Sequence, residues 1–143
     1  VDLIQSVDRV KLMDAIEAEA ARQGIVQDIL LEINIGREPS KSGFAPEEIF
    51  PVLDRFMNYS HLRVKGLMAI PPICQHPGEN FRFFQEILRL SVDIKGKKYD
   101  NVTAECLSMG MSDDFADAIA CGSTMIRVGT AIFGARNYAN SHL

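Results

Sequence analysis

The chain has 143 residues and a formal net charge of -4, with 47% hydrophobic and 24% charged residues. This length supports one domain with a real core, and the composition is typical of a globular protein. The negative charge gives no reason to expect nucleic acid or an anionic membrane as a partner. The apolar runs are far shorter than the roughly 20 residues that cross a bilayer. We therefore expect a cytoplasmic protein whose partners are neither nucleic acid nor membrane.

The cysteines and histidines show no spacing that is typical of a disulfide framework or a zinc site. They are scattered along the chain, without a CxxC or HExxH pattern: Cys74, Cys106, Cys121, His61, His76 and His142. This pattern fits a reducing cytosol and indicates that no metal is bound.

The first elements are predicted as a strand, a helix and a second strand. Residues 2–8 form a short extended run, and from Asp8 apolar residues recur at the spacings of three and four that indicate a helix. Gly24 is placed to end that helix. Residues 28–35 are a compact, isoleucine-rich run, which predicts a buried strand.

After a polar loop over residues 36–44, a second helix is expected near Pro46. Proline suits the first helical position, and Glu47 and Glu48 suit the positive end of the helix dipole. Pro51 lies further in, so it either shifts the start of the helix or kinks it.

The remaining elements continue the alternation, with a final strand at the end. Strands are predicted over residues 63–70, 101–109 and 124–134, and helices over residues 81–96 and 112–122. Alternating strands and helices predict a parallel sheet with helices packed outside it. Either an open doubly wound sheet or part of a (β/α)₈ barrel satisfies this pattern, since a complete barrel needs about 250 residues. Neither a GxGxxG nor a GxxxxGK[ST] motif supports the open sheet.

The segment "LSMGMSDD", residues 107–114, carries the first candidate binding residues. Ser112 is expected to cap the following helix, with Asp113 and Asp114 in its first turn, where backbone amides favour an anion. Gly110 would let the backbone approach a ligand closely. Capping serines occur on many helices, and the two aspartates are better dipole partners than phosphate ligands.

The second candidate segment is "RVGTAIFG", residues 127–134. Arg127 lies within an apolar strand, where a guanidinium is costly unless it is paired, so it should meet an acid, a phosphate or a ring nitrogen. Gly129 and Thr130 follow where amides and a hydroxyl can face an oxyanion. In barrels, phosphate sites frequently form from the loops after the last two strands. Lys41, in contrast, lies in a polar loop and does not look like a Schiff-base lysine.

Three segments resemble the pyridoxal phosphate homeostasis protein family: "LLEINIGREPSKSGF", "VKGLMAIPP" and "LSMGMSDDFADAIACGSTMIRVGTAIFGAR". That family is built on the alanine-racemase N-terminal barrel. The resemblance implies a single-domain (β/α)₈ barrel that binds pyridoxal 5'-phosphate (PLP). It also implies a role in keeping the cofactor (vitamin B6) and amino-acid pools balanced, mostly without enzymatic activity.

Residue by residue, the resemblance implies that Ser112, Gly129 and Thr130 hold the phosphate and that Ser108 lines the same pocket. Arg127 would lie near the pyridine nitrogen. The related racemases also place a serine fifteen positions before such an arginine, as Ser112 and Arg127 are placed here. An arginine at that position keeps the ring nitrogen unprotonated and weakens the electron sink. It suits a carrier or a restrained racemase.

The family's Schiff-base lysine lies on the first strand, in a valine-serine-lysine context that this chain lacks; neither Lys41 nor Lys65 takes its place. Residues 1–143 are therefore expected to be the C-terminal part of one PLP-binding domain, with strands four to eight and their helices but without the N-terminal strands. Such a chain would bind the cofactor weakly, through the phosphate, and could self-associate through two open sheet edges.

Three functions follow from these expectations: a non-catalytic PLP-binding protein, a PLP-dependent amino-acid racemase of the alanine type, and a truncated fragment without a functional site. The racemase needs a second catalytic base, usually a tyrosine from another domain. Tyr59, Tyr99 and Tyr138 are the tyrosines of the chain, and the sequence places none of them as that base.

Overall fold

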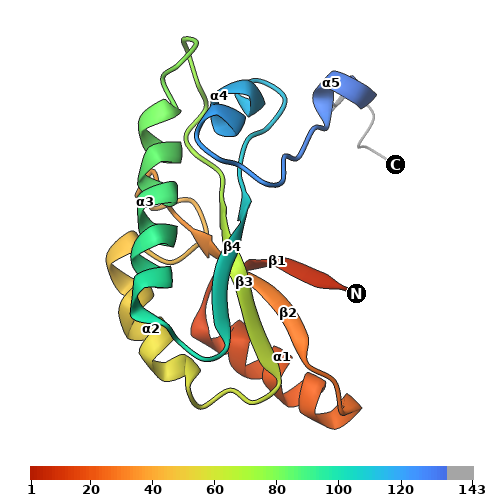
Figure 1. Cartoon of the computed structure of the whole chain (residues 1–143). Helices are drawn as coiled ribbons and strands as arrows, with labels where there is room; N and C mark the ends of the chain where they lie inside the picture. Colours follow the sequence, from red (N-terminus) through yellow and green to blue (C-terminus); the bar gives the residue numbers. More distant parts are fainter. Residues whose placement is uncertain (135–143) are drawn as a thin grey trace.

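A parallel four-stranded sheet organises the protein, whose computed structural model describes residues 1–134 (Figure 1). The strands run in the spatial order β1-β2-β3-β4, each parallel to its neighbour. Their bounds are β1 Leu3–Val7, β2 Gln27–Ile33, β3 Leu62–Ala69 and β4 Val102–Ser108. The α/β class and the parallel sheet predicted from the alternation of elements are confirmed.

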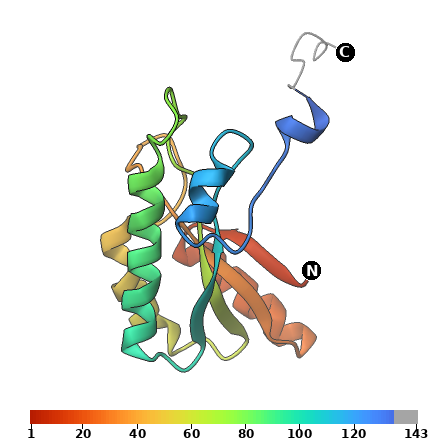
Figure 2. The same ribbon diagram turned by 45° about the horizontal axis from the view of Figure 1, so that its top comes forward.

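Helices α1, α2 and α3 pack along one side of the sheet, whereas α4 lies beyond the end of β4 and α5 projects away from the sheet (Figures 1 and 2). Their bounds are α1 Val10–Gln23, the 3₁₀ turn η1 Pro46–Glu48, α2 Ile49–Phe56, α3 Phe81–Lys97, α4 Phe115–Ala120 and α5 Thr130–Phe133. Met13 of α1, Leu53 of α2 and Phe84 of α3 are fully buried in the core with Ile29 and Leu31 of β2. Burial of this face is the main source of the fold's stability.

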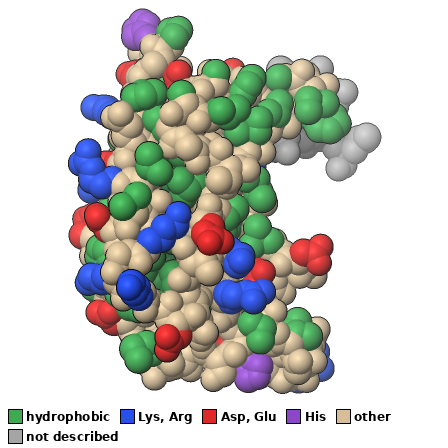
Figure 3. Space-filling view, in the orientation of Figure 1, with side chains coloured by type: hydrophobic (Ala, Val, Ile, Leu, Met, Phe, Trp, Pro, Cys, Tyr) green, Lys and Arg blue, Asp and Glu red, His purple; other side chains and the backbone are tan. Residues whose placement is uncertain are grey.

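The sheet curls towards its uncovered side, as an arc of a barrel does. β1 and β4 are its two outer strands, which in a flat sheet would lie about 14 Å apart, beyond the reach of side chains that stand perpendicular to the sheet. The Ser108 hydroxyl of β4 nevertheless donates to Gln5 Oε1 of β1 at 2.8 Å. A register irregularity in every strand pair adds to this curvature. In Figure 3 the surface is correspondingly hollowed between the N-terminal edge and the α5 segment.

Two predicted helix boundaries are confirmed together with their physical cause. Gly24 ends α1 in the left-handed conformation, at φ 66°. Pro51 does shift the helix start: η1 turns first, and α2 begins at Ile49. The proline then lies in the first turn of α2, where its missing N–H has no intrahelical partner to lose.

The predicted strand over residues 124–134 is wrong. Only Met125 pairs with the sheet, through an isolated parallel bridge to Ser108, and Thr130–Phe133 form the helical turn α5. Regular pairing is short: the Met125 N–H donates to the Leu107 carbonyl and the Met125 carbonyl accepts the Met109 N–H, but the Arg127 N–H donates to the Gly110 carbonyl, one residue beyond the acceptor of a regular parallel ladder. The Gly129 N–H then donates to the Ser112 side chain, so the ladder is not continued. Within residues 1–134, no helix is long and apolar enough to cross a membrane.

Gly66 allows β3 and β4 to approach closely, and this predicts a large cost for a side chain there. A Cβ at Gly66 would lie 1.8 Å from the Cys106 carbonyl oxygen, whereas a Cβ at Gly96 of α3 would meet nothing within 4 Å. We expect Gly66→Ala to lower the free energy of unfolding by about 3 kcal/mol. Gly96→Ala should raise it by about 0.5 kcal/mol through the entropy of the unfolded chain. Urea titrations should show changes in the free energy of unfolding of opposite sign for the two variants. Equal changes would contradict the close approach of β3 and β4 at Gly66.

Candidate functional site

The polar groups of the concave face gather at the carboxyl ends of the strands. Gln5 comes from β1, Glu32 from β2 and Ser108 from β4, and Arg127 reaches them from the segment that folds over β4. Ser108 has no exposed surface. Since parallel strands end at one edge of a sheet, residues that are far apart in sequence meet there.

Arg127 is the centre of this cluster. Its Nη1 donates to the Ser108 hydroxyl at 2.5 Å and its Nη2 to the Ala69 carbonyl, at the end of β3, at 2.9 Å. Burial lowers the pKa of Arg127, and the nearby carboxylates of Glu32 and Asp114 counteract that effect. The guanidinium therefore stays charged and holds β3, β4 and the segment around residue 127 together. Arg127 lies outside any strand, and its direct partners are a hydroxyl and a carbonyl, not the acid, phosphate or ring nitrogen that the sequence suggested.

Ser112 does not cap α4, which corrects the sequence-based expectation. The helix begins at Phe115, with Asp114 at its N-cap. The Ser112 hydroxyl instead accepts hydrogen bonds from the backbone N–H groups of Gly129 at 3.3 Å and Ala131 at 3.2 Å. Ser112, Gly129 and Thr130 are thus brought together at the start of α5. The reason is that the Ser112 hydroxyl bonds to backbone N–H groups at the start of α5 and not at the start of α4.

Gly110 links the two parts of the cluster and has a packing reason to be glycine. Its φ is +97°, and a Cβ would lie 2.6 Å from the Ala118 Cβ. Its carbonyl accepts the Arg127 N–H at 3.0 Å. α4 can therefore lie directly against the end of β4 only because position 110 has no side chain. Of the two methionines that flank it, Met109 is fully buried and Met111 is partly exposed.

Sequence reasoning missed Gln5, Glu32 and Asn80. Gln5 and Glu32 interrupt apolar runs, which is the signal that could have drawn attention to them. Burial raises the pKa of Glu32, repulsion from Asp8 adds to the rise, and Arg127 opposes it. A pocket of about 200 Å³ lies beside Glu32 and is also lined by Asn34, Lys41 and Ile70.

Lys41 belongs to an ordered loop, as the sequence predicted. Its ammonium contacts Glu38 Oε2 at 2.6 Å and donates to the Pro71 carbonyl at 3.1 Å. The side chain that holds the loop is Asn34, which donates to the carbonyls of Glu38 and Lys41. The lysine is therefore engaged in loop structure.

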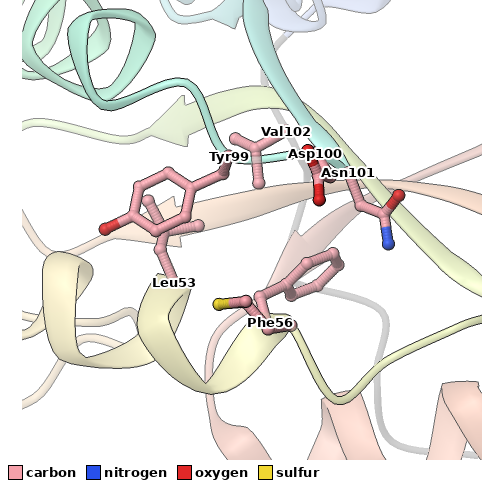
Figure 4. Close-up of a pocket in the computed structure, with 7 residues that line it drawn as sticks. Leu53, Phe56, Tyr99, Asp100, Asn101 and Val102 are labelled. Atoms are coloured by element: carbon pink, nitrogen blue, oxygen red, sulfur yellow. The ribbon is translucent and has the colours of Figure 1, made fainter.

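Two tyrosines lie at the opposite end of the sheet. Tyr59 donates to Asp14 at 2.5 Å and Tyr99 to Asp54 at 2.8 Å; burial, followed by the hydrogen bond to each aspartate, raises the pKa of both to about 12. Tyr99 also lines a small pocket of about 70 Å³ with Leu53, before the start of β4 (Figure 4). Tyr138 lies outside the described residues. Across residues 1–134, no three His, Cys, Asp or Glu side chains are arranged to hold a metal ion.

The fold and the site define an α/β protein that presents hydroxyls, backbone amides and a half-buried arginine at the carboxyl edge of a parallel sheet. The chain belongs to the family described as alanine racemase, N-terminal domain, whose profile matches residues 1–137. The predicted relationship to pyridoxal phosphate homeostasis proteins is also confirmed. A protein of that name from Haemophilus influenzae is 42% identical over 98% of this chain.

Solved structures agree with this placement. A crystal structure of an unknown protein from Bifidobacterium adolescentis matches 93% of this chain with a TM-score of 0.86 at 35% identity, and this covers 53% of that chain. PipY of Synechococcus elongatus with PLP bound matches 93% of this chain with a TM-score of 0.81 at 28% identity, and this covers 61% of that chain. The chain spans 59% of the length of the Haemophilus relative.

The raised pKa of Glu32 predicts a pH-dependent stability. A carboxyl group whose pKa is higher in the folded state favours folding when protonated, and this contribution is lost as the pH rises through the folded-state pKa. Glu32→Gln should therefore stabilise the protein slightly at pH 7, and the gain should disappear below the ordinary glutamate pKa of 4.5. Thermal unfolding between pH 4 and 8 measures this. Glu105→Gln, at an exposed position of β4, is the control and should show no such crossover; a gain at every pH would contradict the assignment.

Proposed function

We propose that this chain provides the phosphate- and ring-binding part of a PLP-binding (β/α)₈ barrel and that the protein serves cofactor and amino-acid homeostasis without catalysing a reaction. In this proposal β1 to β4 correspond to strands four to seven of the barrel and residues 124–134 to the eighth. All of residues 1–143 then belong to one domain. The observation that carries the proposal is the convergence of Ser112, Gly129 and Arg127 at one edge of the sheet.

The residues present fit a phosphate group. The N–H groups of Gly129 and Ala131 point at one oxygen, that of Ser112. A phosphate oxygen could accept the same two N–H groups, with the Ser112 hydroxyl turning to donate. Thr130, the first residue of α5, adds its own N–H and hydroxyl to the same turn. Uncharged donors of this kind, arranged in advance, are how proteins commonly hold phosphate groups.

The aromatic ring would lie towards Arg127 and Ser108. Two of the five guanidinium N–H groups are used by Ser108 and Ala69, which fixes the plane of the side chain and leaves donors for a ring nitrogen. PLP supplies an electron sink when its ring nitrogen is protonated. Arg127 donates a hydrogen bond but gives up no proton, so it would hold that nitrogen in its neutral form. This favours storage of the cofactor over catalysis.

Further features support binding without catalysis. Lys41 is committed to its loop, and Tyr59 and Tyr99 lie at the opposite end of the sheet, away from the proposed site. We therefore propose that this chain holds PLP through its phosphate and without a covalent bond. The three free cysteines, Cys74, Cys106 and Cys121, fit a cytoplasmic location.

The proposal predicts binding that depends on the phosphate. The 143-residue chain should bind PLP more tightly than pyridoxal, which lacks the phosphate, in equilibrium dialysis. Ser112→Ala should weaken PLP binding by about tenfold, since a hydrogen bond to a charged group contributes about 1.5 kcal/mol. Ser60→Ala, at an exposed position before β3, should bind as the wild type does. Equal affinity for PLP and pyridoxal would refute the proposed phosphate site.

We also propose self-association through the open edge of β1. A groove of about 340 Å³ beside that strand is lined mainly by apolar residues, among them Ile4, Ile16 and Ile25. An unpaired strand edge next to apolar surface favours pairing with another chain. Sedimentation velocity should therefore show dimers or larger species whose fraction falls when Ile4→Lys is introduced; a purely monomeric wild type would contradict this.

A further inference from the structure

Asn80 and Asp114 occupy N-cap positions, but their side chains do not cap the helices that they precede. Each is the N-cap residue of a helix, α3 and α4 respectively, and asparagine and aspartate at that position usually bond to the first turn of their own helix. Neither side chain makes such a bond. Asn80 is nonetheless only 2% exposed. A buried polar side chain that does not cap its helix needs partners elsewhere.

Those partners join two loops. Asn80 Nδ2 donates to the Pro72 carbonyl at 3.0 Å, within its own loop, and to Asp114 Oδ2 at 2.8 Å across the gap between the helices. We call this pair the Asn80–Asp114 clasp. It ties the segment between β3 and α3 to the start of α4, both of which lie at the carboxyl edge of the sheet.

The second oxygen of the aspartate extends the clasp to Ser112. Asp114 Oδ1 accepts the N–H of Met111 at 2.7 Å, and the N–H of Phe115 returns to the Met111 carbonyl at 2.9 Å. Residues 111–115 therefore form a closed turn that contains Ser112. The orientation of this turn decides where the Ser112 hydroxyl meets the N–H groups of Gly129 and Ala131.

We propose that Asn80 and Asp114 are positioning residues for the phosphate end of the site: the clasp holds the turn that carries Ser112 in place for the ligand's phosphate. This inference rests on the proposed function. It assigns a role to a carboxylate that, by charge alone, should repel a phosphate. The two effects have opposite signs, so the removal of Asp114 distinguishes them.

The same helix offers a matched control. Asp117 Oδ2 accepts the N–H of Gly78 at 3.2 Å, so it also joins α4 to the loop between β3 and α3. Within residues 1–134, however, no hydrogen bond joins Asp117 to residues 111–112. Asp117→Ala therefore removes one charge and one bond between loop and helix, but leaves the turn around Ser112 held.

The test compares the affinities of Asn80→Ala, Asp114→Ala, Asp117→Ala and the double variant Asn80→Ala/Asp114→Ala for PLP and for pyridoxal. Asn80→Ala and Asp114→Ala should each weaken PLP binding by about tenfold and leave pyridoxal binding unchanged. The double variant should be no weaker than the poorer single variant, because both changes break one connection. Amide hydrogen exchange at Gly129 and Ala131 should accelerate in these variants. Asp117→Ala should change neither property.

Asp114→Asn serves as the second variant in case the alanine variants fold poorly. It keeps an acceptor for Met111 but turns an NH₂ group towards the Asn80 NH₂ group. The exchanged pair Asn80→Asp/Asp114→Asn restores the bond between the two positions with its donor and acceptor reversed, although Asp at position 80 can no longer donate to the Pro72 carbonyl. It should therefore recover part of the PLP affinity that Asp114→Asn loses.

Each outcome separates the inference from the function on which it rests. A wild type that does not distinguish PLP from pyridoxal overturns the proposed phosphate site and, with it, the clasp. A wild type that prefers PLP, with clasp variants that keep this preference or bind PLP more tightly, overturns the clasp alone. Equal losses of PLP affinity in Asp114→Ala and Asp117→Ala would show that any bond between the loop and α4 has the same effect. This result would also overturn the clasp.

Discussion

The half-buried guanidinium of Arg127 is the constraint on which the carboxyl edge of this protein depends. A charge partly removed from water needs polar partners, and here two of them are direct: Ser108 at the end of β4 and the Ala69 carbonyl at the end of β3. The Glu32 carboxylate of β2 adds a longer-range electrostatic attraction. The Ser108 hydroxyl in turn donates a hydrogen bond to Gln5 Oε1 of β1. Arg127 and Ser108 thereby connect β1, β3 and β4 and hold the segment around residue 127 against the end of β4.

The segments around Arg127 are stabilised by side chains that bond between elements and not within them. The Ser112 hydroxyl bonds to the start of α5 and not to the start of α4. Asn80 and Asp114 bond to each other across two loops and cap neither α3 nor α4. Such bonds do not cap α3 or α4 and therefore contribute little to the stability of either helix by itself. They fix the relative positions of junctions that must cooperate to hold one ligand, and this is what a binding site needs.

Much of the fold could be predicted from local patterns because local physics determines it. The apolar runs of β2 and β3, the helical periodicity of α1 and the left-handed Gly24 all depend on neighbours a few residues away. The failure at residues 124–134 has a non-local cause. Those residues have the composition of a strand, but their backbone bonds to the end of β4 extend only from Met125 to Arg127, and the Gly129 N–H donates to the Ser112 side chain instead. A segment with the composition of a strand forms one only where a neighbouring strand can pair with it along its length.

The sequence by itself determined the elements up to β4, their parallel order, the need of Arg127 for polar partners and the family to which the chain belongs, because these follow from residue type and spacing. Only the tertiary structure decided which partners Arg127 meets, which junction uses Ser112, and that Gln5, Glu32 and Asn80 belong to the same edge. Gln5 and Ser108 are 103 positions apart, and they meet only because the sheet curls. The curvature is a property of the packed sheet as a whole, and no short stretch of residues encodes it.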